Sequence, residues 1–359
     1  MRSYLDHNAT SPLRPEAKAA MLSALEAGGN ASSVHFEGRA ARKIADDARE
    51  QLAFALGCLP QMIAFTSGGT EANNWALRSA GAEHLVVSAV EHPSVLACAK
   101  AAGKPVDVIP VDHRGRLDLN ALEAKLGRAN TLVSVMLANN ETGVVQDIHA
   151  VIALAKAKGA LVHVDAVQGF GKRYVNFGFL GCDLLTVCAH KAGGPAGIGA
   201  LVIRDGLVIE PLLAGGGQEL RRRAGTENIA AIAGFAAIAG LPHLDTYALT
   251  DQLEAALSDA VIFGDGVERL CNTTCFAIPG MTAETLLMNL DLDGFAVSSG
   301  SACSSGKVGR SHVLEAMGVA PALAAGAIRV SSGWNTTEED ISRFIAALDQ
   351  LKMRRRAAA

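Results

Sequence analysis

Three short segments contain residue types that could bind an anionic cofactor and perform chemistry on it. Gly68 and Gly69 lie between a predicted strand and a predicted helix. Adjacent glycines let main-chain N–H groups converge there, and the start of the helix adds partial positive charge, so this turn suits a phosphate. Asp165 ends an apolar stretch, where a buried carboxylate needs a cationic partner. Lys191 ends another such stretch before a glycine-rich segment, and a lysine in that setting can lose its proton and form a Schiff base.

Each of these features has a simpler explanation when it is taken alone. Glycine-rich turns often hold no phosphate, and an isolated Asp165 could cap a helix or form a salt bridge. The combination is more specific, because Asp165 precedes Lys191 by 26 residues and both follow the glycine turn. Pyridoxal phosphate requires an anion site, a partner for its ring nitrogen and an imine-forming amine. The sequence therefore predicts a pyridoxal-phosphate site.

The elements expected to position these residues alternate along the middle of the chain. Short apolar runs separated by helical patterns predict a large domain with a mostly parallel, seven-stranded sheet, followed by a smaller α+β domain. Ligands in such open sheets bind beyond the carboxyl ends of the strands. We expect the large domain over 13–245 and the small one over 1–12 and 246–359. The predicted strands cover residues 62–66, 85–88, 106–110, 131–136, 161–165, 184–187 and 199–203, then 274–278, 296–297 and 327–331.

A second chemical feature is a lone cysteine, Cys303, in a run of serine and glycine over residues 298–312. That run has almost no apolar anchor, which predicts a flexible loop. A structural cysteine prefers burial, so one in this setting is interpreted as reactive. The basic residues Lys307 and Arg310 nearby favour its thiolate form. The alternative is a redox-sensitive bystander.

These motifs together resemble those of the NifS/IscS-like cysteine desulfurases, which are class V aminotransferases with the type I pyridoxal-phosphate fold. The resemblance covers nearly the whole chain, and one of its motifs, SSGSAC, is highly specific to cysteine desulfurases. The matching segments are LDHNAT (5–10), GNASSVH (29–35), EH (91–92), NNE (139–141), DAVQ (165–168), HK (190–191), RAGT (223–226), SSGSAC (298–303) and IRVS (328–331).

The resemblance implies a catalytic role for Lys191, His92 and Cys303 and a cofactor contact for Asp165. Lys191 would carry the cofactor and Asp165 would pair with its ring nitrogen, while His92 would stack on the ring and shuttle protons. Cys303 would accept sulfur from L-cysteine as a persulfide, leaving L-alanine, and would pass the sulfur to an acceptor protein. Taken alone, His92 could equally be the capping residue of the helix that starts at Pro93.

The resemblance also implies the residues that hold cofactor and substrate. Cys188 stands where a phosphate-binding serine or threonine is usual in the family, so one hydroxyl contact is replaced by a weak thiol donor or lost. Thr226 would reach the phosphate from a neighbouring subunit, which implies a homodimer. The remaining contacts would come from Gly69, Thr70 and His190 at the phosphate, Asn140 and Gln168 beside the ring hydroxyl, and Asn30 and Arg329 at the substrate carboxylate.

The bulk composition excludes several other functions. A formal charge of −4 gives no reason to expect nucleic acid, and no apolar run reaches the length of a membrane span. Seven scattered cysteines and a polar amino terminus indicate a reducing compartment, hence the cytoplasm. The cysteine spacing predicts no metal site. Two readings stay open beside cysteine desulfuration, namely a selenocysteine lyase or related β-eliminating enzyme and an inert partner that keeps the fold.

Overall fold

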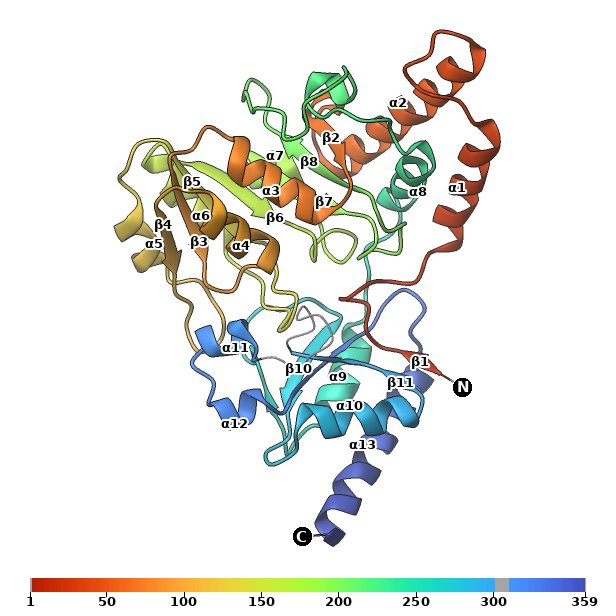
Figure 1. The fold of residues 1–359 in the computed structure, drawn as a ribbon. Coiled ribbons are helices and arrows are strands. Elements are labelled where there is room, and N and C mark those ends of the chain that lie inside the picture. The colour runs from red at the N-terminus through yellow and green to blue at the C-terminus, as the bar shows by residue number, and fades with distance from the viewer. Residues whose placement is uncertain (1, 301–309, 359) are drawn as a thin grey trace.

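The structure, a computed structural model, describes residues 2–300 and 310–358. Within that part the chain forms a larger α/β unit around one sheet and a smaller unit around an antiparallel sheet. Figure 1 shows the larger unit above the smaller one, with the amino terminus beside the smaller unit. This position arises because strand β1 (Ser3–Tyr4) pairs in parallel with β11 (Phe295–Ala296).

The larger sheet has seven strands, as expected. In order across the sheet these are β2 (Ile63–Thr66), β8 (Gly199–Ile203), β7 (Leu184–Cys188), β6 (Leu161–Asp165), β5 (Thr131–Met136), β3 (His84–Ser88) and β4 (Val106–Ile109). Strand β8 runs antiparallel to both neighbours, whereas the other adjacent pairs are parallel. Parallel strands are covered on both faces, which explains why they appear in the sequence as continuous apolar runs.

Helices cover both faces of this sheet. The face with the glycine turn packs against α3 (Gly69–Ser79) and α4 (Pro93–Ala101), around the fully buried Trp75. The opposite face carries the larger apolar core. Its helices are α1 (Pro15–Ala27), α2 (Phe36–Leu56), α5 (Leu119–Lys125), α6 (Ile148–Ala157), α7 (Phe177–Leu180) and α8 (Ile229–Ala239).

The smaller unit has a four-stranded sheet packed against helices around its own core. Across the sheet the strands are β12 (Ser298–Ser299), β13 (Ala327–Ser331), β10 (Thr273–Ala277) and β9 (Val261–Ile262). The helices are α9 (Tyr247–Ala255), α10 (Ala283–Leu292), α11 (His312–Ala316), α12 (Pro321–Ala324) and α13 (Glu338–Ala358). The strand predicted over 296–297 is replaced by two short strands, β11 and β12. The exact division of the chain into domains stays a prediction.

None of the helices in the described part combines the length and apolar character needed to cross a membrane. The six cysteines outside residues 301–309 are all free thiols.

Candidate active site

A cavity of about 290 Å³ lies where the carboxyl ends of β5, β6 and β7 meet the glycine turn before α3. Ten of the predicted site residues line it: Gly69, Thr70, His92, Asn140, Asp165, Gln168, Cys188, His190, Lys191 and Arg329. Asn8, Ala9, Asn73 and Ser94, which the sequence reasoning did not assign, also line it. Cys303 lies outside the described residues.

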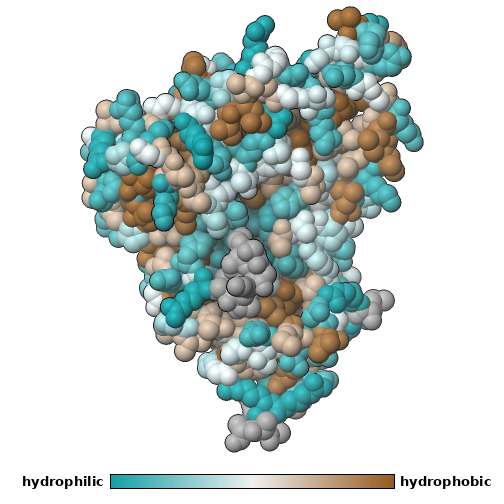
Figure 2. Space-filling view, viewed as in Figure 1, coloured by the Kyte–Doolittle hydropathy of each residue, from teal (hydrophilic) through white to brown (hydrophobic). Residues whose placement is uncertain are grey.

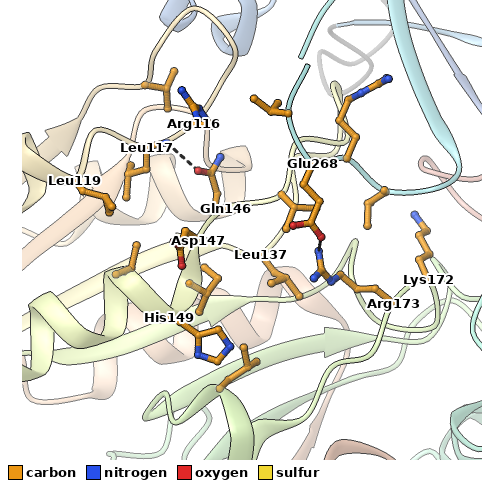
Figure 3. Close-up of a pocket in the computed structure, with 18 of the residues that line it drawn as sticks. Arg116, Leu117, Leu119, Leu137, Gln146, Asp147, His149, Lys172, Arg173 and Glu268 are labelled. Atoms are coloured by element: carbon orange, nitrogen blue, oxygen red, sulfur yellow. Dashed lines mark hydrogen bonds and ion pairs between the residues drawn. The ribbon is translucent and has the colours of Figure 1, made fainter. Parts of the chain in front are cut away.

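A larger groove of about 1120 Å³ runs beside α5, α6 and α7, and Lys172 and Cys271 contribute to its lining. We call it the side groove (Figure 3). Its rim arginine Arg173 pairs with Glu268 at 3.0 Å, so that charge is already compensated. The residues predicted to perform chemistry line the smaller cavity instead, and we place the active site there despite its lesser volume.

Lys191 reaches the cavity from the turn that follows β7. Its Nζ donates hydrogen bonds to the main-chain oxygens of Asn8 and Ala9, both at 2.7 Å. The turn is tight, because Gly193 has a φ of +88° and Gly194 N–H donates to Ala189 O. The amino-terminal segment therefore forms part of the cavity wall and holds the Lys191 amine.

Asp165 ends β6 as a buried carboxylate with neutral donors around it. Val167 N–H donates to Oδ1 at 3.0 Å and Asn73 Nδ2 donates to Oδ2 at 2.7 Å. Burial raises the pKa of Asp165, and these two hydrogen bonds oppose that rise. Asn73 lies one helical turn after Gly69, and this i, i+4 spacing was the sequence signal that it faces the same cavity.

His92 caps a helix and also faces the cavity, and its role in stacking and proton transfer stays a prediction. It is the N-cap of α4, with Nδ1 accepting from the Ser94 N–H at 3.1 Å, and its ring also lines the cavity. Because a main-chain N–H can only donate, Nδ1 must be unprotonated, so the neutral ring carries its proton on Nε2. Burial lowers the pKa of His92 and favours this neutral form. The capping interaction thus sets the tautomer.

The glycine turn and the start of α3 would suit an anion, and we call this part of the cavity the α3 cradle. Gly68, with a φ of +150°, is the N-cap of the eleven-residue α3, whose first main-chain N–H groups are available at the cavity. A Cβ on Gly69 would lie 2.8 Å from Val167 Cγ2, so a side chain there would crowd the cavity wall. Burial raises the pKa of the Cys188 thiol to about 11 and lowers that of His190 to about 4. Both groups are therefore neutral near pH 7.

Arg329 enters the cavity from β13 of the smaller sheet, buried almost completely. The sequence reasoning expected a buried guanidinium to need an anion, and the structure provides one in Asp6, which accepts from Nη2 at 2.6 Å. Nη1 donates to Asn140 O at 2.8 Å, whereas Nε has no hydrogen-bond partner among the described residues. Asp6, in the LDHNAT segment, was missed because it lies far from Arg329 in sequence.

Two of the predicted residues do not line the cavity of their own chain. Asn30 is exposed in the segment between α1 and α2, where its Oδ1 accepts from Ser32 N–H at 2.9 Å. Its predicted contact with the substrate carboxylate therefore does not arise within a single chain and stays a prediction. Thr226 is also exposed, as a residue serving another subunit must be. Its role stays a prediction.

Comparison with known proteins agrees with this geometry. The family model described as aminotransferase class-V matches residues 3–344. The chain belongs to the class V aminotransferase family. A cysteine desulfurase of Cereibacter sphaeroides is 43% identical over 98% of this chain and 97% of its own length, and the cysteine desulfurase IscS of Dictyoglomus turgidum is 40% identical over 97% and 94%. The structure of a NifS-like protein from Rickettsia africae superposes with a TM-score of 0.91 at 37% identity, covering 98% of this chain and 99% of the other.

The fold is thus fold type I of the pyridoxal-phosphate enzymes, as the sequence predicted.

One further buried acid of this class V chain was not assigned from the sequence. Glu91 precedes His92, and its Oε1 accepts from Ser88 Oγ at 2.6 Å and from Met136 N–H at 2.7 Å. Oε2 has no hydrogen-bond partner among the described residues. Burial raises the pKa of Glu91 to about 8, so this side chain is a neutral acid at pH 7.

Glu91→Gln is expected to make the stability of the chain less dependent on pH. The folded-state pKa of Glu91, about 8, lies above the ordinary 4.5. Protonated Glu91 therefore contributes its full stabilisation below pH 4.5, and this contribution is lost as the pH rises from 4.5 through 8. That loss costs about 1.4 kcal/mol per pH unit for one group. Urea unfolding across this range should give a flatter profile for the variant than for wild type. The exposed control Glu83→Gln should keep the wild-type slope, and an equally steep profile for Glu91→Gln would contradict the assignment.

Proposed function

We propose that the chain is a cysteine desulfurase, which uses pyridoxal phosphate to remove sulfur from L-cysteine. The products are L-alanine and a persulfide on Cys303, from which an acceptor protein takes the sulfur. The observation that carries this proposal is the placement of the Lys191 amine and the Asp165 carboxylate in one cavity, beside the cradle at Gly69. The curated relatives named above, which align with nearly the whole chain, are cysteine desulfurases.

The side chains present in the cavity fit the cofactor. The α3 cradle with Thr70 and His190 supplies neutral donors for the phosphate, with Cys188 beside them and Thr226 of a second copy as the further contact. Asp165, held by two neutral donors, suits a protonated ring nitrogen, and His92 would cover the ring. Asn140 and Gln168 would lie on the side of the ring hydroxyl. When bound, pyridoxal phosphate supplies the carbonyl that Lys191 attacks and the ring that takes up electrons from the substrate carbon.

The chain's own groups then bind the substrate and move its protons. Arg329 binds the substrate carboxylate, for which a guanidinium with an unpartnered Nε is suited. Lys191 Nζ takes the proton from the α-carbon, and His92, with its proton on Nε2, donates toward the substrate. The Cys303 thiolate forms a bond to the substrate sulfur as the bond from that sulfur to Cβ breaks. The three-carbon remainder gains protons and leaves as alanine.

A second copy of the chain completes the site in this proposal. Helices α1 and α2 and the segment joining them leave large apolar side chains exposed, and Figure 2 shows apolar residues at this end of the molecule. These side chains are Leu22, Leu25, Val34, Phe36 and Phe54. Burying them in a homodimer would be favourable, and Asn30 lies in the same region. We place the reaction in the cytoplasm, where free thiols such as those described here persist.

The proposed function is tested by supplying the purified holoenzyme with L-cysteine and, separately, with L-selenocysteine. We expect alanine from L-cysteine together with one equivalent of sulfur for each alanine. An enzyme that formed alanine from selenocysteine but ignored cysteine would contradict the assigned substrate. Absence of any bound cofactor would instead support the reading of an inert relative.

Ser94→Ala is expected to lower turnover of L-cysteine by about tenfold. The variant removes a hydroxyl that lies 2.8 Å from His92 Nδ1 and 2.9 Å from Asn73 Nδ2, and one hydrogen bond contributes roughly 1 kcal/mol. The main-chain N–H of residue 94 still donates to His92 Nδ1. The preference for the proton on Nε2 should therefore decrease but not reverse. Steady-state kinetics across pH should show the loss mainly in kcat. An unchanged kcat would show that this hydroxyl does not support His92.

A further inference from the structure

A second buried lysine, Lys172, lies behind the active-site cavity. Its Nζ donates to Gln168 Oε1 at 2.6 Å and to Asn8 Oδ1 at 2.7 Å. Residues 168 and 172 lie in one helical turn after β6, where Phe170 N–H donates to Ala166 O and Arg173 N–H to Gly169 O. The i, i+4 spacing places both side chains on the same face. Figure 3 shows Lys172 at one end of the side groove, near Arg173.

The two residues that accept from Lys172 are linked to Lys191 through one main-chain oxygen. Gln168 Nε2 donates to the main-chain oxygen of Asn8 at 3.0 Å, and the same oxygen accepts from Lys191 Nζ at 2.7 Å. Lys172, Gln168 and Asn8 therefore form a closed ring of hydrogen bonds, and one atom of that ring touches Lys191. The Gln168 amide is thereby oriented with its oxygen toward Lys172 and its nitrogen toward the main-chain oxygen of Asn8, where an amide nitrogen can only donate.

The surroundings of Lys172 are unusual for a structural lysine. Both of its hydrogen-bond acceptors are neutral amides, and its charged neighbours are the cations Lys191 and Arg329. The titratable groups His7, His190, Cys188 and Cys271 also interact with it electrostatically. Burial, with these cations, holds the pKa of Lys172 well below its usual range. Burying a lysine without a carboxylate partner costs free energy of folding. We therefore expect Lys172 to have a function in the site.

We propose that Lys172 is a positioning residue for the reaction, which holds the Gln168 amide and the Asn8 main chain in the orientation that they present to the Lys191 amine. In its protonated form Lys172 would also favour the neutral, nucleophilic form of Lys191, because two neighbouring ammonium groups repel each other. This inference rests on the proposed function only in taking Lys191 as the amine that binds the cofactor. The geometry itself involves residues of this chain alone.

The decisive readout is the reactivity of the Lys191 amine in the full-length, cofactor-free chain. Acetylation by acetic anhydride across a pH series, followed by mass spectrometry of the Lys191 peptide, gives the midpoint at which the amine becomes reactive. In Lys172→Met this midpoint should rise by about one pH unit, because a neighbouring charge is lost. In the holoenzyme, kcat for L-cysteine should fall about tenfold with little change in KM. The exposed control Lys158→Met should match wild type in both measurements.

Two additional variants separate positioning from a merely structural role. Lys172→Arg keeps the charge and the donors, so it should restore the Lys191 midpoint; a folded Lys172→Arg chain with the midpoint of Lys172→Met would contradict the proposal. Gln168→Met removes the acceptor, and combining it with Lys172→Met should cost no more in kcat than the worse single variant. Additive losses, or an unchanged midpoint in Lys172→Met, would overturn the proposal. Because acetylation needs neither cofactor nor cysteine, its outcome is independent of the proposed substrate.

Discussion

Replacing Lys191 with alanine is expected to reduce alanine formation from L-cysteine by about four orders of magnitude or more, since one side chain serves as both nucleophile and base. In the structure its Nζ is the amine at the centre of the cavity, held by the main-chain oxygens of Asn8 and Ala9. Alanine can neither attack a carbonyl nor take up a proton. The measurement is alanine release by the purified variant supplied with excess cofactor.

A matched control removes a lysine amine elsewhere. Lys158 is exposed at the end of α6, and Lys158→Ala should retain wild-type turnover. The cofactor should bind the Lys191→Ala chain reversibly through the α3 cradle and Asp165, and gel filtration should remove it. Turnover by Lys191→Ala within tenfold of wild type would show that another amine carries the cofactor.

Replacing Cys303 with alanine is expected to abolish sulfur transfer while leaving the cofactor bound. The loss should be about three orders of magnitude, because no other nucleophile replaces the thiolate that attacks the substrate sulfur. Bound cofactor should remain because none of the residues lining the cavity is altered. The measurement is the sulfide released from L-cysteine in the presence of a reductant, together with the visible absorbance of the holoenzyme.

A second cysteine provides the control for that experiment. Cys58 is half-buried after α2, and burial raises its pKa to about 12, so it is unreactive at neutral pH. Cys58→Ala should release sulfide as wild type does. If Cys303→Ala releases sulfide at the wild-type rate, the assigned nucleophile is wrong.

The sequence predicted the elements that are governed by local pattern. Four strands, at 131–136, 161–165, 199–203 and 327–331, have the expected bounds. The first three belong to the larger sheet, which is covered on both faces, so they appear in the sequence as mostly apolar runs. Because parallel strand ends meet at one edge, the residues that follow them were correctly expected to share a site. Asp165 and Lys191 follow this rule, since each lies at or just beyond the end of a strand and both line the same cavity.

The missed features depend on contacts between distant parts of the chain. Asp6 reaches Arg329, and Asn8 reaches the cavity, because β1 pairs with β11 and Asp6 pairs with Ser331, far along the chain. No local pattern encodes that register. Helix α2 has a readable signal, since Ala41, Ala45, Ala48 and Leu52 are buried at helical spacing, but it was not assigned. Helix α1 buries only two alanines, so its sequence has little periodicity to detect.

In the proposed reaction, sulfur moves from cysteine to Cys303 at a site built around Lys191. The most direct test of this transfer is one turnover of the holoenzyme with L-cysteine, without reductant or acceptor, followed by mass spectrometry of the Cys303 peptide. We expect one alanine per active site and a Cys303 peptide heavier by one sulfur atom. Alanine formed in that amount with Cys303 unmodified, and the sulfur free or on another cysteine, would contradict the proposed transfer.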